Sequence, residues 1–152
     1  MEVDGGNMKK SVFFSSKTDD WATPQWFYDE LNSEFKFSLD PCADEYNHKC
    51  DAYFTKEDDG LSKKWDGTVF CNPPYGREIG KWVAKAYDEA KNGCVVVMLI
   101  PARTDTRWFH DYIYKKAEVR FIKGRLKFGD SKNSAPFPSM VVIFDGRLQY
   151  DN

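Results

Sequence analysis

The tetrapeptide Asn72-Pro-Pro-Tyr75 follows a short apolar run at residues 69–71 and is the stretch of the sequence with the most specific chemistry. Two consecutive prolines fix two φ angles and keep Asn72 out of the α-helical region, so an extended, rigid segment is expected. The apolar run predicts a strand, which places Asn72 at the strand's carboxyl end, where open α/β sheets bind ligands. The segment is therefore a candidate site, and the alternative is a stiff turn that only ends the strand.

The chemistry that suits this segment is methylation of an amino group on a planar ring. The Asn72 side-chain oxygen and the Pro73 carbonyl are acceptors that can take both hydrogens of an NH2 group, and Tyr75 can stack on the ring. Drawing the hydrogens out of the ring plane returns the lone pair to nitrogen for in-line attack on a methyl sulfonium. The nitrogen becomes acidic only as the methyl group arrives, so catalysis rests on positioning and electrostatics.

The elements on either side of the tetrapeptide predict a β-α-β unit. An amphipathic helix follows it, with apolar residues at helical spacing, namely Ile79, Trp82, Val83, Ala86, Tyr87 and Ala90. The helix ends at Asn92-Gly93, and residues 94–100 form a continuous apolar run typical of a strand buried on both faces. The loop after this strand carries Arg103 and Arg107 and is expected near Asn72 if the two strands are neighbours.

The N-terminal part of the sequence predicts a helix followed by a strand, and the strand ends in a carboxylate. Residues 1–17 indicate a loose arm, and Thr23 and Pro24 indicate a helix over residues 24–34 with Thr23 as its N-cap. Residues 35–39 alternate apolar and polar, so a strand is expected to end at Asp40. Asp40 is placed to receive the ammonium of an amino-acid-like cofactor, or it is an ordinary cap before a turn. Asp59 belongs to a solvated acidic loop or contacts the adenine amino group of a cofactor.

The C-terminal part predicts strands at residues 119–122 and 125–128 with an antiparallel partner at residues 140–144. The expected fold class is therefore α/β, with a mostly parallel sheet and a C-terminal antiparallel strand pair. The 152 residues suffice for one domain with a single core. We expect a flexible arm over residues 1–17 and one catalytic domain over residues 18–152, with no room for a separate target-recognition domain.

Charge and cysteine content narrow the compartment and the partners. Residues 1–76 carry 8 Lys/Arg against 15 Asp/Glu, a net −7, whereas residues 77–152 carry 14 against 9, a net +5. A basic half is compatible with a salt-sensitive phosphate contact surface or with a solvated face of mixed charge. No apolar stretch is long enough to span a membrane, no signal core is evident, and four cysteines in a chain of this size favour reduced thiols in a cytoplasm. Cys42, His48 and Cys50 lack a fourth zinc ligand, so no metal is expected.

In combination, the motifs resemble those of the phage-type DNA N6-adenine methyltransferases over residues 20–144. The residues that carry the resemblance are Trp21-Ala-Thr-Pro24, Asp40-Pro-Cys-Ala43, Asn47 with Cys50, Asp59-Gly-Leu61, Trp65, Asn72-Pro-Pro-Tyr75, Trp82, Leu99-Ile-Pro-Ala102, Trp108-Phe-His110 and Gly124-Arg-Leu-Lys-Phe128. The resemblance implies a Rossmann-like methyltransferase fold, S-adenosylmethionine as methyl donor and adenine N6 in double-stranded DNA as acceptor. It also implies that the protein works in the cytoplasm, which is that of a bacterial host if the protein is phage-encoded. It implies no obligate protein partner.

Roles for individual residues follow from this resemblance. The catalytic segment would be Asn72, Pro73, Pro74 and Tyr75, and the base would be flipped out of the duplex toward Tyr75. The cofactor site would include Thr23, Pro24, Asp40, Pro41, Cys42 and Ala43, with Asp59 added. DNA contacts are expected from Tyr75, Arg77, Arg103, Arg107 and Arg125.

Two departures from methyltransferases at large affect these expectations. Residues 43–46 replace a glycine-rich loop after the first strand, and sequence reading must come from loops such as residues 77–81, 103–107 and 129–138. The alternatives are methylation of an RNA base or a protein glutamine amide, and a catalytically idle DNA-binding module.

Overall fold

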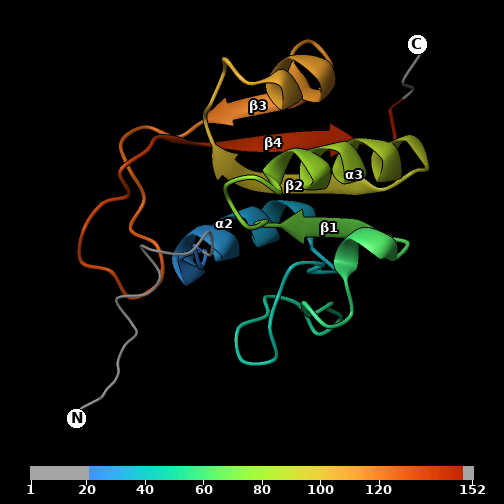
Figure 1. Ribbon diagram of the computed structural model, residues 1–152. Coiled ribbons are helices and arrows are strands. Elements are labelled where there is room, and N and C mark those ends of the chain that lie inside the picture. The colour runs from blue at the N-terminus through green and yellow to red at the C-terminus, as the bar shows by residue number, and fades with distance from the viewer. Residues whose placement is uncertain (1–20, 149–152) are drawn as a thin grey trace.

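The computed structural model describes residues 21–148, and its centre is a four-stranded sheet in the order β1-β2-β4-β3 (Figure 1). The strands are β1 (Thr68–Cys71), β2 (Val95–Pro101), β3 (Glu118–Phe121) and β4 (Ser139–Asp145). The helices are α2 (Gln25–Phe35), α3 (Ile79–Lys91), a 3-10 turn η2 (Gly60–Ser62) and a π-helical turn η3 (Phe109–Ile113). The expected arm at residues 1–17 lies outside the described residues.

The β-α-β unit expected around the tetrapeptide is confirmed. Strands β1 and β2 are parallel neighbours, with Cys71 opposite Met98, and α3 connects them. Helix α3 buries the apolar face that its spacing predicts, and Gly93 ends the connection at φ 111°, a conformation that favours glycine. All seven residues of β2 are buried, as expected for a strand covered on both faces.

Strand β4 lies between β2 and β3 and pairs antiparallel with both. The predicted strand pair of residues 119–122 and 140–144 is therefore present, but the predicted strand at residues 125–128 is not. Both sides of β4 are already paired, so residues 125–128 cannot pair with β4. It follows Gly124 at φ 76°, and the Leu126 carbonyl accepts the Ala135 N–H instead. The fold is mixed α/β, but only one of the three pairings between named strands is parallel.

The strand predicted at residues 35–39 is much shorter in the structure. Helix α2 runs through Phe35, and Lys36 ends it in the left-handed region. The chain then lies beside β1 only just before Asp40, where a parallel bridge joins Leu39 to Val69. A second parallel bridge joins Asp40 to Tyr53, so the carboxyl end of this short segment meets the same sheet edge as the end of β1.

The N-cap of α2 is Pro24 rather than Thr23. The Pro24 carbonyl accepts the N–H groups of Phe27 and Tyr28, and Pro24 has the extended backbone of a cap. The hydroxyl of Thr23 is engaged elsewhere, with the side chain of Asn72.

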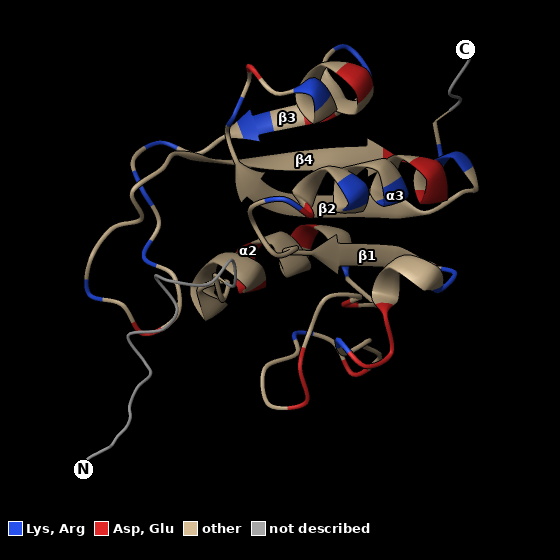
Figure 2. Ribbon diagram, in the orientation of Figure 1, with Lys and Arg blue, Asp and Glu red and all other residues tan. Residues whose placement is uncertain are grey.

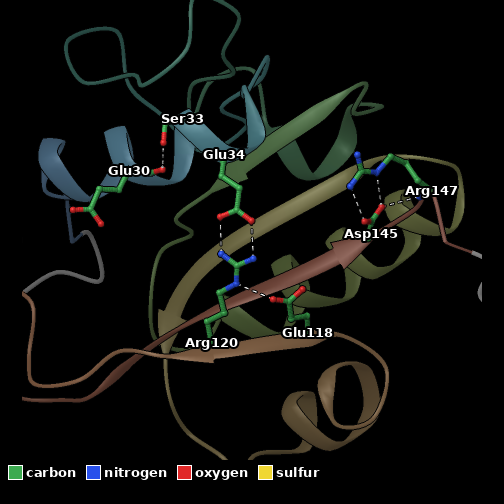
Figure 3. A network of polar contacts seen from close by, with 7 residues as sticks. All are labelled: Glu30, Ser33, Glu34, Glu118, Arg120, Asp145 and Arg147. Atoms are coloured by element: carbon green, nitrogen blue, oxygen red, sulfur yellow. Dashed lines mark hydrogen bonds and ion pairs between the residues drawn. The ribbon is translucent and has the colours of Figure 1, made fainter.

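The two helices cover opposite faces of the sheet. Phe70 of β1 packs on Tyr28 of α2 at a ring-centroid distance of 5.2 Å, and Phe144 of β4 packs on Tyr87 of α3 at 6.2 Å. On the α2 side, Arg120 of β3 holds the Glu34 carboxylate through two hydrogen bonds of 2.7 Å (Figure 3). Hydrogen bonding to Arg120 lowers the pKa of Glu34. This ion pair joins α2 to the outer strand of the sheet.

Candidate active site

The side chain of Asn72 is held from the segment before α2. Its Nδ2 donates to the Trp21 carbonyl and, at 2.8 Å, to Thr23 Oγ1. Its Oδ1 is buried and has no hydrogen-bond partner among residues 21–148. Asn72 and Thr23 are 49 residues apart, so the fold, and not the local sequence, creates this arrangement.

These contacts fix which way the amide of Asn72 faces. Turning the amide over would bring Oδ1 against the Trp21 carbonyl oxygen, so the nitrogen belongs on that side. An unpaired buried acceptor costs about 1–3 kcal/mol, and such groups are rare in folded proteins. Asn72 therefore presents a preoriented acceptor that is ready for a donor from outside the chain.

Tyr75 is only 3% exposed, and its hydroxyl donates to the Leu99 carbonyl at 3.0 Å. Burial raises its pKa well above the usual range, so the phenol stays neutral and anchors the end of the tetrapeptide on β2. Its ring meets Phe128 and Phe137 edge-on, at centroid distances of 6.3 and 5.6 Å. Stacking of a target base on Tyr75 stays a prediction, and it requires these two rings to move.

Trp21, Phe128 and Phe137 form an aromatic cover over Tyr75. Trp21 contacts both phenylalanines edge-on at 5.7 and 5.1 Å. The Gly129 N–H also bonds the Ala22 carbonyl at 2.8 Å, which ties the segment before α2 to the loop after β3. Sequence reasoning missed this cover, although Phe128 and Phe137 bracket the polar loop and so indicated that its two ends are anchored.

Asp40 is a buried carboxylate at the same sheet edge, 5% exposed. Its oxygens accept the Lys49 N–H at 2.9 Å and the Cys42 N–H at 3.4 Å. Burial raises its pKa, and these two bonds partly offset that effect. The described residues form no salt bridge to Asp40, because Lys49 Nζ donates to Gln25 Oε1. The charges of Lys49 and His48 also lower the pKa of Asp40, but burial outweighs them, so the carboxylate keeps acceptor capacity for a cationic group.

The other residues predicted for the cofactor surround Asp40 or lie one loop away. Pro41 is buried, and its carbonyl oxygen lies so close to Gly60 that a Cβ there would be 2.1 Å from it. The Ala43 N–H bonds the Phe54 carbonyl. Asp59 is exposed at the start of η2, whereas the neighbouring Asp58 closes the loop through the Thr55 N–H and hydroxyl. Thr23 and Pro24 are buried, with Thr23 on Asn72.

The predicted DNA-contacting arginines are exposed. Arg77 follows the tetrapeptide, and Arg103 and Arg107 follow β2 at the same edge of the sheet. Arg125 lies after β3 and makes one long hydrogen bond, 3.4 Å, to the Ala135 carbonyl. Figure 2 shows Lys and Arg along the segment between β3 and β4, while Asp and Glu predominate in the loops before β1.

His48 and Cys50, two of the three potential zinc ligands, have other partners. His48 Nδ1 bonds the Cys50 carbonyl and its ring stacks on Tyr53, while Cys50 Sγ pairs with the Tyr28 hydroxyl. Within residues 21–148, no group of three or more His, Cys, Asp or Glu is arranged to hold a metal ion. Over the same residues, no helix has the length and apolarity needed to cross a membrane.

Comparison with known proteins identifies the relatives of the chain. Residues 10–148 match the model of the family described as DNA N-6-adenine-methyltransferase (Dam). The chain is 31% identical to the DNA N-6-adenine-methyltransferase of Haemophilus phage HP1 over 152 residues, which cover 94% of this chain and 88% of the phage protein.

Two further relatives match shorter stretches. The DNA N-6-adenine-methyltransferase of Escherichia phage T1 is 30% identical over 128 residues, 82% of this chain and 53% of that protein. A putative methyltransferase of Escherichia coli K12, YfdM, is 40% identical over 65 residues, 38% of this chain and 71% of that protein. With the matched family model covering residues 10–148, this chain belongs to the DNA N-6-adenine-methyltransferase (Dam) family.

Proposed function

We propose that this protein transfers a methyl group from S-adenosylmethionine to N6 of adenine in double-stranded DNA. Family membership and the two phage relatives support the reaction. The observation that carries the site assignment is the buried, unpaired Oδ1 of Asn72, which the fold orients with two hydrogen bonds from Nδ2.

Asn72 acts on the amino group of the target base. Its Oδ1 accepts one N–H of that group, and the Pro73 carbonyl, fixed by the two prolines, accepts the other. Both acceptors hold the hydrogens out of the ring plane, so the nitrogen lone pair faces the donor. Because these acceptors are set before the base arrives, little reorganisation is needed during the reaction.

The carboxylate of Asp40 fits a cationic cofactor group. A buried carboxylate whose pKa is raised by burial gains from a nearby positive charge, and Asp40 has no ion-pair partner among the described residues. The ammonium of S-adenosylmethionine is such a charge, and Pro41 to Ala43 and Asp59 would complete the site. S-adenosylmethionine, when bound, supplies the methyl group.

We further propose that the sheet belongs to a Rossmann-like methyltransferase domain. The parallel bridges from Tyr53 to Asp40 and from Leu39 to Val69 extend the parallel part of the sheet beyond β1. The carboxyl ends of these segments and of β1 and β2 then share one edge. Cofactor and base would meet there, between Asp40 and Asn72.

The class of methyl acceptor can be tested by offering each candidate acceptor separately. Purified protein is incubated with labelled S-adenosylmethionine and unmethylated duplex DNA, matched RNA, or a glutamine-containing peptide. Label is expected in DNA alone. Transfer to RNA or peptide with none to DNA would contradict the proposed substrate. No transfer together with intact DNA binding would favour the idle binding module.

A further inference from the structure

A second open site lies at the far end of the sheet edge that carries Asn72. Strand β3 runs parallel to β2, because both are antiparallel to β4. Phe121, at the end of β3, and Thr104, after β2, therefore lie at the carboxyl edge, as Asn72 does (Figure 1). Three strand spacings of about 4.8 Å separate β1 from β3, or roughly 14 Å.

Between η3 and β3 lies a groove, which we call the η3–β3 groove, and Phe121 and Thr104 lie at its end on this edge. Its cavity of about 530 Å³ is in the size range of small-ligand sites. Its lining residues are Thr104, Phe109, His110, Ile113, Tyr114, Lys115, Ala117, Val119 and Phe121. Most of this lining is apolar or aromatic.

Two aromatic side chains of the groove are unusually exposed. Phe121 is 65% exposed and Tyr114 is 51% exposed, and they are two of only five large hydrophobic residues exposed in residues 21–148. Phe121 shares a sheet face with Val119, so its ring projects on the η3 side, away from the Arg120–Glu34 ion pair. A ring left in water at the rim of a groove offers a stacking surface.

The surroundings of the groove are positively charged. Residues 101–138 carry nine Lys/Arg against four Asp/Glu, a net +5 in a chain of net −2. Lys115 lines the groove and lies 5.4 Å from the centre of the Tyr114 ring, and exposed Arg103 and Lys123 lie close by in sequence. Exposed rings among cations suit a polyanion that carries planar bases.

We propose that the η3–β3 groove binds one unstacked base of the substrate DNA, with Phe121 as the stacking platform and Lys115 on a neighbouring phosphate. This proposal rests on the proposed function. Base pairs rise about 3.4 Å, so the roughly 14 Å between the ends of β1 and β3 corresponds to about four base-pair steps. The groove thus gives this domain a second point of DNA contact.

The test compares DNA affinity among variants of exposed aromatic residues. Phe121→Ala is expected to weaken binding of a labelled duplex roughly 5- to 150-fold, the loss typical of one stacked base. Phe121→Trp retains affinity, and Phe121→Leu does not, because only a planar ring stacks. Tyr46→Ala is the matched control, since Tyr46 is 91% exposed and lies in the acidic loops, and its affinity should equal that of the wild type.

Further readouts identify the contact. Lys115→Ala should lower the slope of log affinity against log salt by about 1, as loss of one phosphate contact does. S-adenosylmethionine binding and the melting temperature of Phe121→Ala should stay at wild-type values.

Three outcomes would overturn the proposal. They are unchanged affinity in Phe121→Ala, wild-type affinity in Phe121→Leu, and a change in oligomeric state in Phe121→Ala, which would make the groove a protein contact. A wild-type protein that neither binds nor methylates DNA would instead refute the proposed function, so the two failures are distinguishable.

Discussion

Substitution of Asn72 by Ala and by Asp separates the proposed catalytic role of this residue from support of the fold. Asn72→Ala removes two donated hydrogen bonds, each of about 1 kcal/mol, but also removes a buried unpaired oxygen that costs about 1–3 kcal/mol. These effects nearly cancel, so the free energy of unfolding should change by less than about 2 kcal/mol.

Asn72→Asp loses the bond to the Trp21 carbonyl without that relief, because a carboxylate has no N–H to donate, whereas the Thr23 hydroxyl can turn to donate to the carboxylate. One carboxylate oxygen faces the Trp21 carbonyl, and a charge is placed in a half-buried position. The free energy of unfolding should therefore fall by about 2 kcal/mol or more. The other oxygen still offers an acceptor where Oδ1 was.

The two variants should therefore rank oppositely in stability and in activity. Asn72→Ala should be the more stable, and it should lose about 100- to 1,000-fold in methyl-transfer rate, the usual effect of deleting one preoriented electrostatic contact. Asn72→Asp should be the less stable and the more active. Thermal unfolding gives the order of stability. Labelled methyl transfer, measured well below both melting temperatures, gives the order of activity. If activity follows stability, or if Asn72→Ala stays within tenfold of the wild type, the acceptor role is wrong.

Three further predictions concern the surrounding site. Tyr75→Phe should lower the free energy of unfolding by about 0.5–1.5 kcal/mol through loss of the bond to Leu99, while base stacking and DNA affinity persist; a large loss of affinity would count against stacking. Gly60→Ala should lower the free energy of unfolding by about 1–3 kcal/mol and weaken S-adenosylmethionine binding, because a Cβ collides with the Pro41 carbonyl. A calorimetric affinity for S-adenosylmethionine equal to that of the wild type would refute the link between Gly60 and the cofactor site. Burial raises the pKa of Asp40, so in the protein without cofactor the free energy of unfolding should fall as the pH rises through that pKa. Cofactor affinity should instead fall as the pH drops through the same pKa, because the carboxyl loses its charge. A calorimetric affinity that stays constant across the acidic range would exclude the proposed pairing of Asp40 with the ammonium.

The central part of the fold could be predicted because its signals are local. The continuous apolar run of β2 and the helical spacing of α3 each specify one element, and both are present. Strand pairing is a choice among distant partners, and the sequence does not encode it locally. Because β4 lies between β2 and β3, it has no free side for residues 125–128, the partner that the sequence suggested for it. Likewise, helix α2 runs through Phe35 and ends at Lys36 in the left-handed region, so the strand expected at residues 35–39 is shortened at its start.

The candidate site shows the same division. The tetrapeptide identified the acceptor on Asn72, because its chemistry is local. The partners that orient this acceptor are Trp21 and Thr23, about 50 residues away, and the helix signal at Thr23 pointed to an N-cap instead. The aromatic cover over Tyr75 also arises from residues distant in sequence, so only the folded chain reveals it.

The most direct test of the proposed function is nucleoside analysis by mass spectrometry of unmethylated duplex DNA treated with S-adenosylmethionine and the protein. We expect N6-methyladenine as the methylated nucleoside, and we expect it to be lost when Asn72→Ala replaces the wild type. Other bases also carry exocyclic amines, so a methylated cytosine or guanine in its place would contradict the adenine assignment. N6-methyladenine undiminished in Asn72→Ala would contradict the role of the Asn72 oxygen.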